Sequence, residues 1–211
     1  MPFPTRRWAL AALAAAALAA PAAAAPLSPA DQALVAKAQA YLQGLGQVKG
    51  RFAQTDPRGG RSAGDLYIKR PGKARFAYDA PRQLLIVSNG SMVSVYDARL
   101  KTFDNYPLGS TPLALFLARD IKLDKGVQIT AVTRFPNGFA ITAKDGRKQA
   151  RGWITLTFAD DPLRLTEWTV TDAQGARTRV QVSGLQAVGG LDPGLFELNN
   201  PLRKPVRAGR Q

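Results

Sequence analysis

The stretch from Leu66 to Asp97 decides the fold of this chain, and it reads LYIKRPGKARFAYDAPRQLLIVSNGSMVSVYD. Leu66 and Ile68 alternate in it with Tyr67 and Lys69. Further on, Phe76 and Tyr78 alternate with Arg75, Ala77 and Asp79. Period-2 alternation is typical of strands with one apolar face. The dipeptide Asn89-Gly90 is a strong hairpin signal. The stretch therefore predicts an antiparallel meander of three or four short strands.

A helix is expected immediately before the first strand. Ser28 is a suitable N-cap, Pro29 suits the first helical position, and glycines at 44 and 46 end the pattern. Apolar residues recur at helical spacing between these limits, so the helix should cover a face of the sheet. They are Leu34, Val35, Ala38, Tyr41 and Leu42.

The same alternation extends in both directions and predicts ten or eleven strands in total. A short apolar helix over residues 113–119, begun by Thr111-Pro112, interrupts the strands. The fold class is therefore mainly β with α: a single large curved antiparallel sheet with short helices on one face. The strands expected outside the central meander are 48–55, 101–106, 127–134, 138–144, 151–158, 163–171 and 177–182.

Composition narrows the chemistry that the chain can perform. Among 211 residues there is no His and no Cys, which removes the commonest general base, the commonest zinc ligands and any thiol nucleophile. We expect no metal site, no cofactor and no catalytic residue. The net charge of +14 has two readings: a solvated surface, or attraction to phospholipid headgroups or an acidic partner.

The N-terminus has the composition of a secretion signal. Arg6 and Arg7 precede an apolar run from Trp8 to Ala20, too short for a membrane span, and small residues follow. We expect residues 1–25 to be cleaved during export to the periplasm, which makes nucleic acid an improbable partner for the positive charge. Residues 26–200 then form one domain, and residues 201–211 form a basic, flexible C-terminal tail.

An ordered set of short motifs resembles the family of periplasmic outer-membrane lipoprotein carriers, the LolA-like proteins. Taken singly these motifs are weak, but their order behind a signal peptide is specific, and it covers residues 47–119. The motifs are Phe52-x-Gln54, Gly64-x-Leu66, Lys69-Arg70-Pro71-Gly72-Lys73 with Arg75 and Tyr78, Pro81, Ile86-Val87-Ser88-Asn89-Gly90, Tyr96-Asp97 and Thr111-Pro112.

The resemblance implies both a fold and a function. The fold is an unclosed half-barrel whose helices form a lid over an apolar cavity. The function is to take acylated lipoproteins from an inner-membrane lipoprotein-releasing ABC transporter and to deliver them, as a monomer, to an outer-membrane acceptor or to the outer membrane itself. Arg70 matches the family arginine that hydrogen-bonds the lid and holds the empty carrier closed, a role suited to five donors in a fixed fork.

Such a carrier needs apolar surface rather than a reactive group. Three positions, Ala74, Phe76 and Ser94, stand where bulkier residues are common in the family, and we expect them to enlarge or reshape the cavity. Alternation alone leaves open which sheet face is concave, and an ordinary packed core remains the alternative role for each lining residue. The candidate lining residues are Phe52, Leu66, Ile68, Phe76, Tyr78, Val93, Leu115, Phe116, Ile154 and Trp168.

Three other functions compete with lipoprotein transport. The first is a periplasmic binding protein for another lipid or hydrophobic ligand on the same fold. The second is a sensor of misplaced lipoproteins, although the chain is too short for the second domain that such sensors carry. The third is an enzyme, which ranks last because no nucleophile elbow or paired-carboxylate motif is present. The residues that such a site would draw on are Ser88, Ser91, Ser94, Lys69 and Asp97.

Overall fold

The computed structural model describes residues 26–111, 113–119, 121, 127–145 and 152–203, with the backbone alone at Leu115 and Asp145. The predicted signal peptide and most of the predicted tail lie outside these residues. Within the described ranges, no helix combines the length and the hydropathy needed to cross a membrane.

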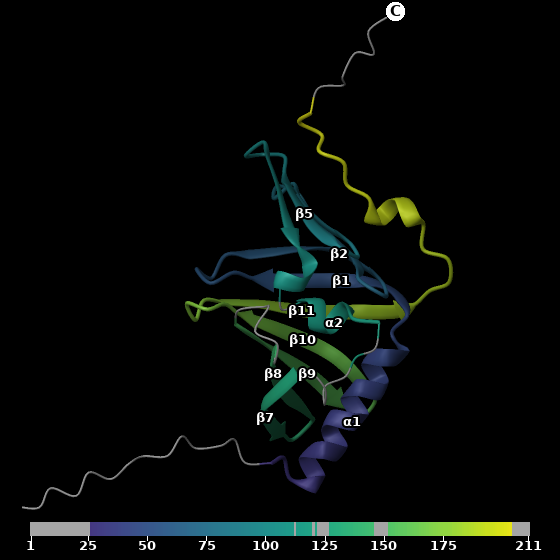
Figure 1. Cartoon of the computed structure of the whole chain (residues 1–211), viewed down its shortest axis with the longest axis vertical. Helices are drawn as coiled ribbons and strands as arrows, with labels where there is room; N and C mark the ends of the chain where they lie inside the picture. The colour runs from purple at the N-terminus through teal and green to yellow at the C-terminus, as the bar shows by residue number, and fades with distance from the viewer. Residues whose placement is uncertain (1–25, 112, 120, 122–126, 146–151, 204–211) are drawn as a thin grey trace, which may run out of the picture.

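One antiparallel sheet of eleven strands dominates the molecule, and it curves strongly without closing (Figure 1). Its strand order is β6-β5-β4-β3-β2-β1-β11-β10-β9-β8-β7, so that among these strands only β1 and β11 pair across a long sequence separation. The predicted fold class is thereby confirmed. The strands are β1 (Gln47–Thr55), β2 (Arg61–Lys69), β3 (Lys73–Tyr78), β4 (Leu84–Asn89), β5 (Met92–Asp97), β6 (Thr102–Pro107), β7 (Val127–Phe135), β8 (Gly138–Asp145), β9 (Trp153–Asp160), β10 (Leu163–Thr171) and β11 (Arg177–Ala187).

The turns of the central meander depend on glycine. Gly72, between β2 and β3, has a φ of +75°, and a Cβ added there would lie 2.6 Å from the Cα of Gly90. Gly90, between β4 and β5, has a φ of +108°. The two hairpin turns therefore meet at Gly72, where a side chain would not fit, while Gly90 has a backbone conformation that glycine adopts readily.

Helix α1 (Pro29–Gly44) packs on the half of the sheet formed by β7 to β9 (Figure 1). The Ser28 side chain caps it by accepting a hydrogen bond from the amide of Asp31 at 3.1 Å. Its buried face presents Ala38 and Leu42, and Tyr41 meets Phe158 of β9 edge to face, with the ring centroids 6.0 Å apart. This cap and this apolar face were both predicted from the sequence, and both are confirmed.

The described parts of the segment between the two edge strands, β6 and β7, lie on the concave side of the sheet. The segment carries a 3₁₀ turn, η1 (Leu108–Ser110), and the short helix α2 (Leu113–Leu117), which lies over the middle of the sheet (Figure 1). Between them, α1 and α2 cover the face on which Leu66, Ile68 and Phe76 are buried.

The C-terminal segment lies on the opposite face of the sheet. The carbonyls of Leu191 and Leu195 accept hydrogen bonds from Lys69 Nζ at 2.9 Å and from Arg75 Nη1 at 3.0 Å. Between and after these anchors the chain forms the turn η2 (Pro193–Phe196), whose Phe196 side chain is fully buried beside β3 and β4. The segment through Phe196 is therefore attached to the sheet by two hydrogen bonds and one buried ring.

Candidate functional site

Aromatic rings form a continuous series across the concave face of the sheet. Phe52 meets Tyr78 and Phe76 edge to face, with the ring centroids 4.9 and 5.4 Å apart. Phe76 meets Trp168 edge to face at 6.1 Å, and Trp168 stacks on Phe116 of α2 at 5.6 Å and an interplanar angle of 29°. Such pairs add about 0.5–1.5 kcal/mol each beyond the burial of their area. Five residues far apart in sequence therefore make one apolar surface.

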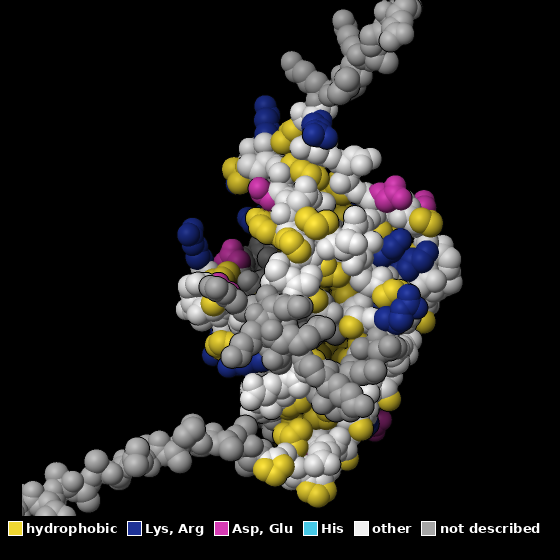
Figure 2. Space-filling view, viewed as in Figure 1, with side chains coloured by type: hydrophobic (Ala, Val, Ile, Leu, Met, Phe, Trp, Pro, Cys, Tyr) yellow, Lys and Arg dark blue, Asp and Glu magenta, His cyan; other side chains and the backbone are white. Residues whose placement is uncertain are grey.

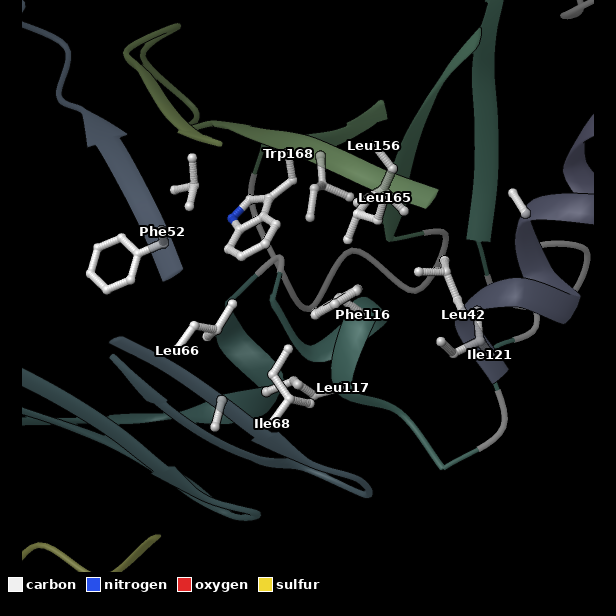
Figure 3. Close-up of a cluster of buried hydrophobic side chains, with 14 of the residues drawn as sticks. Leu42, Phe52, Leu66, Ile68, Phe116, Leu117, Ile121, Leu156, Leu165 and Trp168 are labelled. Atoms are coloured by element: carbon white, nitrogen blue, oxygen red, sulfur yellow. The ribbon is translucent and has the colours of Figure 1, made fainter. Parts of the chain in front are cut away.

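Aliphatic side chains complete this surface on both sides of the rings (Figure 3). Leu66 and Ile68 of β2 lie close to Phe116 and Leu117 of α2, while Leu42 of α1 lies beside Ile121. A short helix thus has its apolar side against strands from both halves of the sheet. Leu117 and Ile121 were not among the predicted lining residues, although both are buried.

Arg70 stands where β2 leads into its turn, and its guanidinium meets the ring of Phe116, with Cζ 5.8 Å from the ring centroid. Burial lowers the pKa of Arg70 to about 10, so the side chain stays charged at neutral pH. Among the described residues, neither Nε nor Nη2 of Arg70 meets a hydrogen-bond partner, although both atoms are buried. The contact with the covering helix is therefore a cation–π contact, and the predicted hydrogen bonds to it are not seen in the described residues.

Two other residues form the hydrogen bonds that hold the segment between β6 and β7, which carries α2 and is called the covering segment below. The amide of Gly72, in the β2–β3 turn, donates to the carbonyl of Leu117 at 2.7 Å. Gln43 of α1 donates from Nε2 to the carbonyl of Arg119 and accepts at Oε1 from the amide of Ile121, both at 3.0 Å. Sequence reasoning missed Gln43, because an amide near the end of a helix is ordinarily solvated.

A groove of about 500 Å³ opens beside this surface, between α1 and β7. Val35, Ala36 and Ala40 of the helix and Ile129 of the strand give it apolar walls, and glutamines of α1 line its rim. It lies at one edge of the sheet, where β7 is the last strand.

The structure places nine of the ten candidate lining residues in one buried cluster. The tenth, Leu115, has a side chain outside the described part of the structure. Burial is equally what a packed core requires, so the lining role stays a prediction. The nine are Phe52, Leu66, Ile68, Phe76, Tyr78, Val93, Phe116, Ile154 and Trp168.

The expectation for Ser94 is wrong, whereas Ala74 and Phe76 do lie in the apolar cluster. Ser94 alternates with the buried Val93 and donates a hydrogen bond to Asn105 Oδ1 at 2.7 Å. It therefore lies on the opposite face of the sheet and has no effect on the volume of the concave side.

The residues considered for an enzyme site have structural partners instead. Ser88 Oγ donates to the carbonyl of Gly72 at 2.6 Å, and Asp97 Oδ1 accepts from the amide of Leu100 at 2.8 Å. Lys69 is engaged with the C-terminal segment. These contacts stabilise turns and leave no paired nucleophile and base among them.

Tyr78 offers a test of how dry the apolar surface is. Burial raises its pKa to about 12, against smaller opposing effects from the charge of Arg82 and from the 2.8 Å hydrogen bond to Gln54 Oε1. In the unfolded chain the phenol ionises near pH 10. The folded state therefore holds the proton between these values, and stability falls as pH rises through that window, by on the order of 2 kcal/mol.

We expect Tyr78→Phe to remove this loss of stability above about pH 10. Urea unfolding on both sides of that pH measures it, with Tyr106→Phe as the control because Tyr106 is 50% exposed. Equal pH dependence of the two variants would contradict a dry environment for Tyr78.

Comparison with known proteins agrees with this architecture. The family model described as outer membrane lipoprotein carrier protein LolA matches residues 43–199. The outer-membrane lipoprotein carrier protein of Chromobacterium violaceum is 29% identical over 189 residues, covering 86% of this chain and 91% of the relative. That of Pseudomonas aeruginosa is 30% identical over 190 residues, covering 81% and 86%.

Among solved structures, a LolA superfamily protein from Nitrosomonas europaea aligns with a TM-score of 0.47 and 12% identity, over 80% of this chain and 97% of that protein. Mycobacterium tuberculosis lipoprotein LppX aligns with a TM-score of 0.46 and 15% identity, over 79% and 100%. The match of the family model includes all the described strands of the sheet, from β1 through β11. The chain therefore belongs to the family of outer-membrane lipoprotein carrier proteins.

Proposed function

We propose that this protein binds the acyl chains of lipoproteins between its concave sheet face and the covering helices, and carries them across the periplasm to the outer membrane. The observation that carries the proposal is the extended apolar surface beneath α2, a helix of five residues. Helices this short have little stability of their own. The cover can therefore move without unfolding the sheet.

The energetics of acyl chains agree with such a surface. Burying a chain is worth about 0.8 kcal/mol per CH₂, so a sixteen-carbon chain in water costs on the order of 12 kcal/mol. A carrier therefore has to offer the acyl chain a comparable apolar surface that is free of polar gaps. In the empty carrier the covering helix occupies that surface. When α2 lifts, the faces of Trp168, Leu66 and Ile68 become available to the cargo.

In this proposal Arg70 acts as the latch of the empty carrier. Its cation–π contact with Phe116 exists only while α2 is seated, and the bonds from Gly72 and Gln43 act in the same direction. These contacts favour the closed state and so assist cargo release. An inner-membrane transporter loads the carrier, and an outer-membrane acceptor or the outer membrane itself receives the cargo.

The test is release of lipoproteins from spheroplasts. Purified protein is added outside the cells, and we expect acylated lipoproteins to appear in the supernatant as a soluble one-to-one complex. Absence of release, with a free lipid found in organic extracts of the purified protein, would replace lipoproteins by another lipid as the ligand.

A further inference from the structure

A pocket lined by arginines lies at the end of the sheet opposite Arg70. Strand β2 runs from Arg61 to Lys69, so that its first residue is at the far end from the latch. There Arg61, Arg82 and Arg99 line a pocket of about 520 Å³ together with Asp79. They come from the start of β2, the loop between β3 and β4, and the turn between β5 and β6, three segments that the meander brings to one edge.

The charge of this pocket is positive. Asp79 accepts two hydrogen bonds from Arg51, which hold the pKa of its carboxyl below the usual range, and the same guanidinium contacts Asp65 at 2.8 Å. Within the described ranges, none of the three pocket arginines forms an ion pair. The three pocket arginines and Arg51 therefore outnumber the two carboxylates of Asp65 and Asp79, and the net charge of the pocket is positive.

An exposed leucine stands beside the pocket. Leu100 is 56% exposed at the tip of the β5–β6 hairpin, between Arg99 and Lys101. The tip is fixed in place: Asp97 holds the amide of Leu100, and the amide of Ala98 donates to the carbonyl of Gln83 at 3.1 Å. The hairpin extends away from α1 and α2 (Figure 1), and in the space-filling view the side chains at this end are a mixture of hydrophobic, cationic, acidic and other polar ones (Figure 2).

We propose that this end docks on the surface of an anionic phospholipid bilayer, with headgroup phosphates between Arg82, Arg99 and Arg61 and with Leu100 inserted at the interface. Arginine forks bind phosphate oxygens with two parallel hydrogen bonds. Basic residues near an anionic surface add to its attraction for a protein, and an apolar side chain adds buried area. The inference does not depend on the proposed cargo.

A bilayer fits these observations better than an acidic protein does. A protein partner needs a broad complementary surface with an apolar centre. Here one leucine projects from a narrow tip with cations on both sides, an arrangement that matches the depth profile of a lipid interface, where charge stays at headgroup level and the apolar group enters further.

The test is sedimentation of the purified protein with vesicles of phosphatidylcholine, with and without phosphatidylglycerol. We expect binding to the anionic vesicles alone, weakened by salt. The double variant Arg82→Gln/Arg99→Gln should bind about 25-fold more weakly, at about five-fold per arginine. The matched control is Arg164→Gln/Arg177→Gln, which removes the same charge from exposed positions of β10 and β11 and retains the basic tail.

Leu100→Ser should lower vesicle binding about five-fold at every salt concentration, because the apolar contribution is not screened. Equal weakening by both double variants would reduce the effect to net charge and overturn the proposal. A different outcome would assign the site to an acidic protein: polyglutamate abolishes vesicle binding, and Leu100→Ser leaves vesicle binding unchanged. Displacement by millimolar inorganic phosphate would assign it to free phosphate.

Discussion

Arg70→Leu is expected to load cargo normally and to deliver it to outer-membrane vesicles about 30-fold more slowly. A desolvated cation–π contact is worth about 2 kcal/mol, and this one forms only when α2 is seated on the sheet. Its loss weakens the closed empty state by that amount. The cargo and α2 compete for the same apolar face of the sheet. Because α2 then binds this face more weakly, the cargo stays bound for longer.

The same substitution should leave the sheet folded. It removes one contact with the covering helix, worth about 2 kcal/mol, and none of the strand pairing. Thermal unfolding of the empty variant should therefore stay cooperative, with the free energy of unfolding lowered by no more than about 2 kcal/mol. A larger loss would show that Arg70 also supports the sheet.

The control for this prediction is Arg164→Leu on β10, where the arginine is exposed. Gln43→Leu is the companion variant, because it breaks both hydrogen bonds to the segment after α2 and should slow delivery in the same direction. Normal transfer by Arg70→Leu to outer-membrane vesicles would refute the latch.

Phe196→Ala is expected to lower the free energy of unfolding by about 3–5 kcal/mol, as for a fully buried phenylalanine. The ring is inaccessible although it lies on the face of the sheet opposite the main apolar cluster, where Val87 is also buried. Its removal takes away the apolar part of the attachment of the C-terminal segment. The hydrogen bonds from Lys69 and Arg75 to that segment should weaken with it.

Denaturant unfolding measures this effect, with Phe135→Ala as the matched control. Phe135 lies on the edge strand β7 and is 42% exposed, so its truncation should cost no more than about 1 kcal/mol. Comparable losses in the two variants would show that the C-terminal segment contributes little to stability.

Local patterns predicted the strands well because one sheet face is buried along most of the chain. The predicted strand 163–171 coincides with β10. The last strand was predicted to end at Val182, but β11 continues to Ala187. Gly184 has a φ of +60°, and the register with β1 shifts between Lys49 and Arg51. This irregularity interrupts the period-2 alternation, so the rest of β11 could not be recognised from the sequence.

The site was less accessible to sequence reasoning, because its contacts join distant segments. The family resemblance pointed to Arg70, but nothing in the local sequence indicated that its partner would be the ring of Phe116. Gln43 carries no signal at all, since its two hydrogen bonds exist only after α1 and the segment beyond α2 are packed.

The covering segment joins the two edges of the open sheet, since β6 and β7 follow each other in the chain. In the proposed function it is therefore a tethered competitor of the cargo. When α2 leaves the sheet, it remains tethered close to its former position. Its effective concentration there is high and depends on the length of the connecting chain. Reclosure is intramolecular and proceeds at the same rate however dilute the carrier becomes, so each departing acyl chain meets a replacement that is already attached.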